Sequence, residues 1–148
     1  MAENGIQRKL RAVLSADVNG YSRLMANDDV RTVDILTRYR RIIADVVTAR
    51  EGRVVDSPGD NLLAEFASSL NAVHAATDIQ KKLEEENAKL PINKRMLFRI
   101  GINIGDIIRK GERIYGNGVN IAARIENLAE PGVYRGLRKR RHNSCRSP

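Results

Sequence analysis

The sequence contains no tryptophan and a single cysteine, Cys145, among its 148 residues. One cysteine excludes an intramolecular disulfide, so a hydrophobic core has to hold the fold together. A chain of this length corresponds to about one domain and buries roughly 70% of its unfolded surface. No apolar run reaches the ~20 residues of a membrane span, and no apolar stretch follows the charged residues 1–11 as in a secretory signal. We therefore expect a cytoplasmic protein.

Aromatic residues are also scarce, at 4% of the chain, although the net charge of +8 suggests a nucleic-acid partner. Residues 132–148 carry six basic side chains and no acid, which leaves 20 basic and 18 acidic side chains for the rest. The basicity is thus a property of the tail. We expect no nucleic-acid partner and a disordered basic tail at 133–148. Contact of that tail with phosphates or acidic lipid is the alternative, and base stacking on sheet aromatics would have to depend on Phe98.

The spacing of apolar residues predicts the order β-α-β-β-α-β-β-α. The expected strands are 11–16, 53–56, 61–66, 97–104 and a short one after it, with turns at Gly105-Asp106 and at 110–112. The expected helices are 28–49, one that begins at Ser68 or Ser69, and one at about 118–129. The face assigned to the first helix is Val30, Val33, Leu36, Ile43 and Val47, and Ile104 is assigned to the buried face of its strand. The order predicts an α+β fold with a ferredoxin-like βαββαβ core, an antiparallel sheet with helices on one face, and a third helix.

Two aspartates are expected to meet at one edge of this sheet. The first strand of a ferredoxin-like sheet lies antiparallel to the third, so Asp17, which closes the first, should lie beside Asp60, which opens the third. Neighbouring carboxylates repel unless a cation holds both, and hard oxygen ligands suit Mg²⁺ or Mn²⁺. The backbone N–H groups of residues 19–22 could hold a phosphate beside them. The alternative is that both aspartates are turn and cap residues.

The third helix carries a second polar pair. Asn120 and Arg124 are four residues apart and therefore share one face. A fixed guanidinium beside an amide can stabilise charge on a transferring phosphoryl group. The alternative is an ordinary surface arginine next to a helix-facing asparagine.

Four segments together carry a family resemblance: ADVNGYS at 16–22, SPGDNLLAEF at 57–66, RIGINIGD at 99–106 and IYGNGVNIAAR at 114–124. In this order and spacing they resemble the bacterial branch of the class III adenylate/guanylate cyclase catalytic domain. The resemblance covers about residues 9–132. A single one of these motifs would not be specific, whereas the four in sequence are.

The resemblance implies conversion of ATP to 3′,5′-cyclic AMP and pyrophosphate by two-metal-ion catalysis, for intracellular signalling. It implies that Asp17 and Asp60 hold two Mg²⁺ or Mn²⁺ ions per site, and that Asn120 contacts the ribose and Arg124 the α-phosphate. In this family the asparagine and arginine come from the opposite protomer, so a homodimer with shared sites is implied. The remaining positions expected to bind nucleotide are Val18, Asn19, Gly20, Tyr21, Ser22, Asp56 and Arg113.

Two of these positions depart from the family pattern. Asp56 stands where the family usually has a lysine, and Arg113 stands where it often has Asp or Thr. One interpretation is a pair across the dimer that still reads a purine, with the choice between ATP and GTP left open. The rival is that the pair blocks the base pocket, which would make the chain an inactive cyclase-like module for dimerisation or nucleotide sensing. A third is that Asp56 is simply a strand-end residue.

The resemblance stops after residue 132. Cyclases of this class continue with further strands, helices and a phosphate-binding lysine, whereas residues 133–148 show no period and few large apolar residues. This pattern is typical of a truncated or frameshifted terminus. We therefore expect an incomplete catalytic domain at 9–132, reduced in stability and activity by itself, whose regulatory domains are absent from this chain.

Overall fold

A computed structural model describes residues 6–55, 61–136 and 144–146. The strands are β1 (Ile6–Val18), β2 (Arg53–Val55), β3 (Leu62–Phe66), β4 (Phe98–Lys110), β5 (Arg113–Tyr115), β6 (Val133–Gly136) and β7 (Ser144–Arg146). The helices are α1 (Tyr21–Asn27), α2 (Asp29–Ala49), α3 (Ser69–Asn87) and α4 (Asn117–Leu128), and a 3₁₀ turn, η2 (Ile92–Lys94), leads into β4. No helix in the described part of the chain is both long and apolar enough to span a bilayer.

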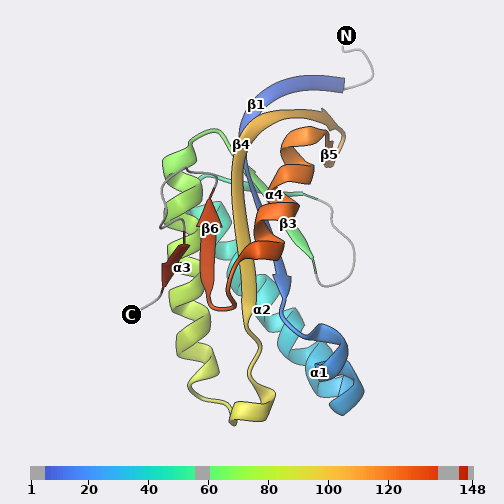
Figure 1. Cartoon of the computed structure of the whole chain (residues 1–148), viewed down its shortest axis with the longest axis vertical. Helices are drawn as coiled ribbons and strands as arrows, with labels where there is room; N and C mark the ends of the chain where they lie inside the picture. Colours follow the sequence, from blue (N-terminus) through green and yellow to red (C-terminus); the bar gives the residue numbers. More distant parts are fainter. Residues whose placement is uncertain (1–5, 56–60, 137–143, 147–148) are drawn as a thin grey trace.

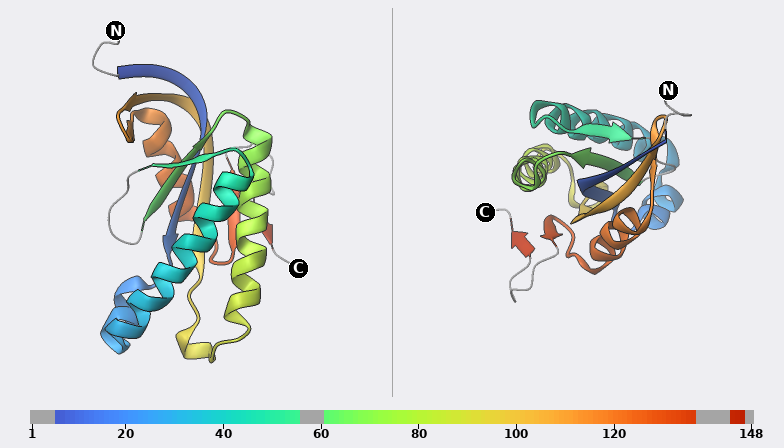
Figure 2. Two further views of the ribbon diagram at one scale, coloured as in Figure 1. Left: turned by 180° about the vertical axis from the view of Figure 1, so that it is seen from behind. Right: turned by 90° about the horizontal axis from the view of Figure 1, so that it is seen from above.

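The strands form one sheet in the order β2-β3-β1-β4-β6-β7, and β5 pairs with β4 outside this path. Strand β1 is antiparallel to both β3 and β4, as the ferredoxin-like prediction requires. Helices α2 and α3 cover one face of the sheet and α4 lies on the other (Figures 1 and 2). Because both faces are covered, the whole apolar run of residues 12–16 in β1 is buried. The α+β prediction is confirmed.

The two central strands are longer than their apolar patterns predict. β1 and β4 each span 13 residues and pair without interruption from Ile6 opposite Lys110 to Val18 opposite Phe98. The turn expected at Gly105-Asp106 is therefore absent, and the chain turns at residues 111–112 instead. Beyond the ends of α2 and α3 the paired strands continue without a helix on that face, whereas α4 still lies against β4 at Gly105 and Asp106 on the other (Figure 2). Ile104 is accordingly 52% exposed, which corrects its assignment to the buried face.

The helix predictions hold better, because caps and apolar spacing are local signals. Asp28 caps α2 by accepting a hydrogen bond from the Arg31 amide, and Ser68 caps α3 through the Asn71 amide. Two residues of the predicted face of α2 are wrong: Val30 and Val33 are 78% and 47% exposed. The buried face of α2 is Thr32, Ile35, Leu36, Tyr39, Ile43, Val46 and Val47. Helix α1 was not predicted, because its seven residues have no apolar period.

Two short strands lie in the segment for which the sequence predicts a tail. β6 pairs parallel to β4, with Ile100 opposite Tyr134, and β7 pairs antiparallel to β6. A free strand edge offers N–H and C=O groups to any extended segment, whatever its side chains. Pairing of this kind leaves no apolar pattern by which it could be predicted.

Candidate functional site

The site is built where β1 ends and β3 begins. Ala16 lies opposite Leu62 in the ladder, and the Asn61 side chain donates to the Ala16 carbonyl at 3.3 Å. Asn61 therefore enters the sheet beside the end of β1, as the predicted juxtaposition requires. Asp60 and Asp56 lie outside the described residues. The assignment of a metal ion to Asp17 and Asp60 together stays a prediction.

Asp17 is held by an arginine that the sequence analysis did not single out. Arg99 stands directly opposite it on β4 and donates from Nε to Oδ1 at 3.2 Å and from Nη2 to Oδ2 at 3.0 Å. This fork-to-fork arrangement is the geometry in which a guanidinium binds a carboxylate best. A positive group thus already lies at the carboxylate expected to bind a cation.

A second acid, Glu126 of α4, lies beneath this pair and is 2% exposed. The Ser15 hydroxyl donates to its Oε1 at 3.1 Å, whereas Oε2 has no hydrogen-bond partner and lies 3.5 Å from Arg99 Nη2. Burial, followed by the neighbouring Asp17 carboxyl, raises the pKa of Glu126 to about 8. An unpaired negative charge on Glu126 is therefore unfavourable in this position.

Helix α4 reaches the sheet closely enough to place Glu126 there because residue 101 is glycine. A Cβ atom on Gly101 would lie 2.6 Å from both the Ala122 carbonyl oxygen and the Glu126 Cα. The helix backbone therefore rests directly on β4. Ser15, the partner of Glu126, is paired with Gly101 in the adjacent strand. The close approach of α4 to β4 and the buried contact between Ser15 and Glu126 therefore lie at the same position in the sheet.

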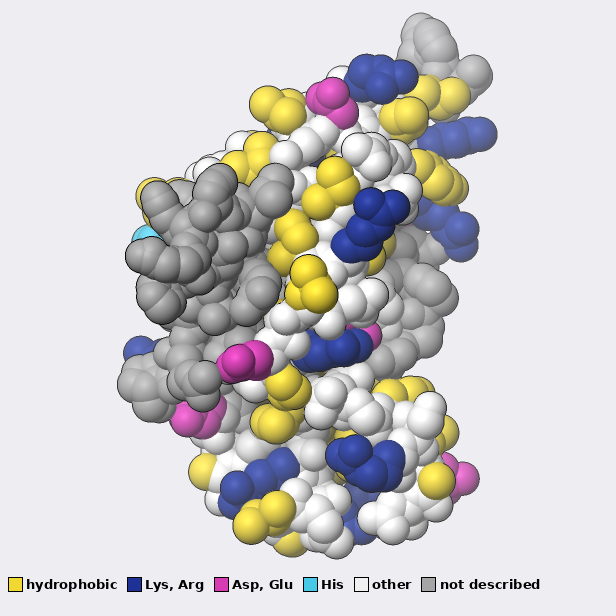
Figure 3. Space-filling view, viewed as in Figure 1, with side chains coloured by type: hydrophobic (Ala, Val, Ile, Leu, Met, Phe, Trp, Pro, Cys, Tyr) yellow, Lys and Arg dark blue, Asp and Glu magenta, His cyan; other side chains and the backbone are white. Residues whose placement is uncertain are grey.

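Asn120 and Arg124 lie on the side of α4 opposite to Glu126. The residues of the helix that are buried against the sheet are Gly118, Ala122, Ile125 and Glu126, whereas Asn120 and Arg124 are exposed. They share one face, as predicted from their spacing, but that face points away from the sheet edge that carries Asp17. Figure 3 views the molecule from the side of α4 and shows patches of Lys and Arg among hydrophobic side chains. Arg113, in β5, is also exposed.

The turn of residues 18–22 links β1 to α1. Gly20 adopts a left-handed conformation, with φ of 69°, and the Asn19 amide donates to the Leu97 carbonyl at 2.8 Å. A phosphate at this turn would therefore have to bind the amides of Gly20, Tyr21 and Ser22. Val18 is 3% exposed, and Tyr21 packs against the main core. Both side chains thus contribute to packing beside the turn.

The described residues supply an incomplete cation site. They contain no group of three or more His, Cys, Asp or Glu side chains placed to hold a metal ion. Asp17 is one-fifth exposed and supplies the carboxylate oxygens that Mg²⁺ and Mn²⁺ prefer. The guanidinium against it shows that this position accepts positive charge. The donor chemistry fits a divalent cation, provided that further oxygens come from residues or ligands outside the described set.

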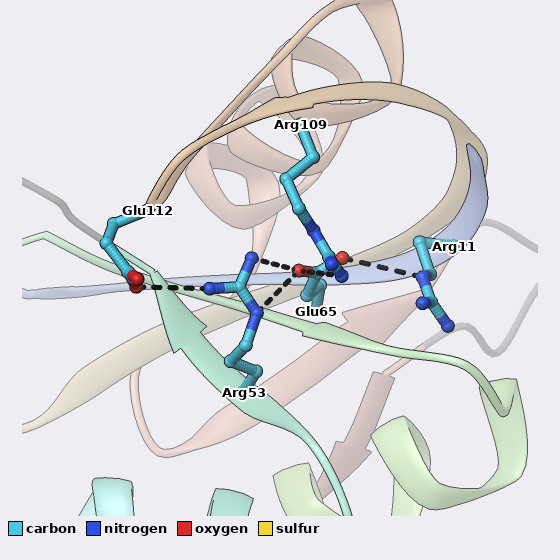
Figure 4. A network of polar contacts seen from close by, with 5 residues as sticks. All are labelled: Arg11, Arg53, Glu65, Arg109 and Glu112. Atoms are coloured by element: carbon cyan, nitrogen blue, oxygen red, sulfur yellow. Dashed lines mark hydrogen bonds and ion pairs between the residues drawn. The ribbon is translucent and has the colours of Figure 1, made fainter. Parts of the chain in front are cut away.

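A separate polar network lies farther along the same face of the sheet (Figure 4). The Glu65 side chain is 2% exposed, and its Oε2 accepts from Arg53 Nε at 2.9 Å and from Arg109 Nη2 at 2.8 Å. Arg11 Nε lies 3.5 Å from Oε1, and Arg53 also reaches Glu112 at 3.3 Å. Arg11 lies six positions before Asp17 on β1, about 20 Å along a strand. The network ties four strands together and does not reach Asp17.

Comparison with known proteins finds a protein and solved structures that are described as adenylate or guanylate cyclases. No protein-family model matches the chain. A Rhizobium meliloti protein named "Putative adenylate cyclase 3" is 42% identical over 133 residues, 89% of this chain and 23% of that protein. The solved structure of an adenylate/guanylate cyclase/hydrolase from Silicibacter pomeroyi is 37% identical, with a TM-score of 0.81, over 88% of this chain and 77% of that one. A solved guanylyl cyclase is 25% identical, with a TM-score of 0.78, over 89% of this chain and 76% of that one. The chain thus spans about a quarter of the length of the Rhizobium protein.

Proposed function

Because the chain belongs to the class III adenylate/guanylate cyclase family, we propose that it converts ATP to 3′,5′-cyclic AMP and pyrophosphate for intracellular signalling. The observation that carries this proposal is the end of β1, where Asp17 lies beside the start of β3 at a position that already binds a positive group. The four sequence motifs that surround this point are those of a nucleotide cyclase. The relatives include proteins described as adenylate and as guanylate cyclases, so the choice of ATP rather than GTP is the more specific part of the proposal.

The chemistry needs a deprotonated hydroxyl and a stabilised leaving group. The ribose 3′-hydroxyl gives its proton to water and its oxygen attacks the α-phosphorus. The new O–P bond closes the ring, and the bond from the α-phosphorus to the oxygen that bridges it to the β-phosphate breaks to release pyrophosphate. Two divalent cations bound by Asp17 and Asp60 would lower the pKa of the hydroxyl and neutralise the triphosphate. Asn120 would orient the ribose and Arg124 would stabilise charge on the α-phosphate.

The outward position of Asn120 and Arg124 supports a shared site. Both are exposed on the side of α4 that faces away from the sheet, so they cannot converge with Asp17 of the same chain without rearrangement of the helix. A second copy of the chain can present its own pair to this Asp17. We therefore propose a homodimer in which each site takes Asp17 from one protomer and Arg124 from the other.

The exchanged charges at Asp56 and Arg113 favour one competing function. A carboxylate at position 56 can only accept hydrogen bonds, whereas a lysine there would donate to the base. If the pair closes the base pocket, the chain is a cyclase-like module that dimerises or binds nucleotide without cyclising it. Binding of ATP with no cyclic product from the wild-type chain would favour this function.

The test measures cyclic AMP and cyclic GMP formed from ATP and GTP with Mn²⁺. We expect wild-type chain to form cyclic AMP, and Asp17→Ala and Arg124→Ala to lower kcat by about 10²–10³-fold, as removal of a transition-state contact does. Arg41→Ala, at an exposed arginine of α2, is the matched control and should keep wild-type activity. Full activity in either site variant would refute the role proposed for that residue.

A further inference from the structure

We propose that Glu126 is a positioning residue, which receives the Arg99 guanidinium when a divalent cation binds Asp17. In this arrangement Arg99 is an internal counter-ion that leaves Asp17 when the metal arrives, and Glu126 is its second carboxylate. The inference depends on the proposed function in one respect, because it takes Asp17 as a cation ligand. It adds a role for Glu126 and a movement of Arg99 from Asp17 to Glu126, neither of which the cyclase chemistry alone requires.

The first support is the position of Arg99 between two acids. Its Nη2 is 3.0 Å from Asp17 Oδ2 and 3.5 Å from Glu126 Oε2. A small rotation of the guanidinium converts the longer contact into a hydrogen bond and releases Asp17. The Arg99 side chain is 25% exposed, so it has room to rotate, whereas a buried guanidinium would be confined by its neighbours.

The second support is the state of the Glu126 side chain. Its Oε2 atom is buried and has no hydrogen-bond partner, and the side chain is 3% exposed. A buried polar atom without a partner is unfavourable and needs an explanation. An acceptor kept ready for a neighbouring guanidinium is such an explanation, since Arg99 is the cation beside it.

The third support is the rigidity of the acceptor. Ser15 holds the other oxygen of Glu126 at 3.1 Å, and the backbone of α4 rests on Gly101 without room for a Cβ. Glu126 is therefore fixed from both the strand and the helix, and the movable partner is Arg99. Without Glu126, a cation at Asp17 would leave Arg99 beside a second positive charge with no carboxylate to bind. Metal binding would then be weakened by the repulsion.

The test is a double-mutant cycle read out by Mn²⁺ affinity, measured without nucleotide by electron paramagnetic resonance and calorimetry. We expect Glu126→Gln, which keeps an acceptor oxygen for Ser15 but cannot offer a carboxylate to Arg99, to weaken Mn²⁺ binding by about tenfold, within the range of coupling between contacting residues. Arg99→Met should strengthen it. In the Arg99→Met background, Glu126→Gln should change the affinity less than about twofold, because no guanidinium remains to be received.

The controls separate this inference from the function it rests on. Glu130→Gln, at an exposed acid just after α4, should leave the Mn²⁺ affinity unchanged, and Asp17→Ala should abolish the binding. An equal loss from Glu126→Gln in both backgrounds would show that Glu126 binds the metal or attracts it at a distance, and would overturn the exchange. Mn²⁺ binding that does not depend on Asp17, together with no cyclic product, would instead refute the proposed function and this inference with it.

Discussion

At the scale of single residues, Glu65 shows how this chain keeps a carboxylate inside the sheet. Three arginines from three strands, Arg11, Arg53 and Arg109, surround it, and none of the three is more than about one-third exposed. All three arginines share this acid, and Arg53 also contacts the exposed Glu112. Because a buried ion pair is costly when one partner is removed, the network should be sensitive to the loss of Glu65 alone.

We predict that Glu65→Gln lowers the free energy of unfolding by about 3 kcal/mol, the low end for breaking a buried pair, because the arginines keep some contact with solvent. Glu112→Gln is the matched control, since Glu112 is 84% exposed and contacts the same Arg53, and it should cost less than about 0.5 kcal/mol. Urea unfolding followed by circular dichroism measures both. Equal losses in the two variants would show that the buried Glu65 contributes no more to the free energy of unfolding than the exposed Glu112.

The polar partners at Asp17 illustrate what a sequence does not reveal at this scale. Asp17 itself was predicted from its place after an apolar strand. Its partner Arg99 is 82 residues away and Ser15 is 111 residues from Glu126, so only the strand register and the packing of α4 bring these pairs together. The one available signal for Glu126 was an acid on the apolar side of a helix, next to Ile125 and one turn after Ala122.

At the scale of elements, the contact of α4 with β4 depends on Gly101. The position needs no unusual backbone angle. It needs the space that a Cβ would take, because the helix backbone lies against it. Any side chain at residue 101 must push α4 away from the sheet, and with it Glu126 and the outward pair Asn120 and Arg124.

We therefore predict that Gly101→Ala destabilises the chain by roughly 1–3 kcal/mol, as overpacking does, and that it also lowers cyclase activity. Gly111→Ala is the control. A Cβ at Gly111 meets no atom within 4 Å, so only its φ of 62° is unfavourable, and it should leave activity unchanged. Thermal unfolding and cyclic nucleotide assays measure the two effects. Wild-type activity in a folded Gly101→Ala chain would contradict the dependence of the site on this contact.

The accuracy of the sequence predictions also differs between the helices and the strands. The starts of α2 and α3 were predicted correctly, at residue 28 and at Ser68 or Ser69, because capping residues are local signals. The lengths of β1 and β4 were underestimated, because backbone ladders extend through exposed residues such as Leu10 without an apolar pattern. The strands expected at 53–56 and 61–66 are present as β2 and β3, and they pair with each other antiparallel.

At the scale of the whole molecule, the proposed catalytic residues lie on two separate surfaces. Asp17 is at the end of β1 under α4, and Asn120 and Arg124 are on the outer side of that helix. A single copy cannot bring these groups to one nucleotide in the arrangement described. If two copies associate with two-fold symmetry, each dimer has two equivalent sites, and each site draws on both chains.

This geometry makes a quantitative prediction for mixed dimers. Asp17→Ala and Arg124→Ala chains should each keep no more than about 1% of the wild-type rate alone. Mixed in equal amounts and allowed to exchange, they should recover about a quarter of the wild-type rate, because half the dimers are mixed and each mixed dimer has one intact site. The recovered rate should fall on dilution as the dimers dissociate.

A mixture of Asp17→Ala with Asp17→Ala,Arg124→Ala chains contains no intact site and is the control that must stay inactive. Failure of the first mixture to recover activity, with mixed dimers demonstrated by native mass spectrometry, would contradict a site shared between chains.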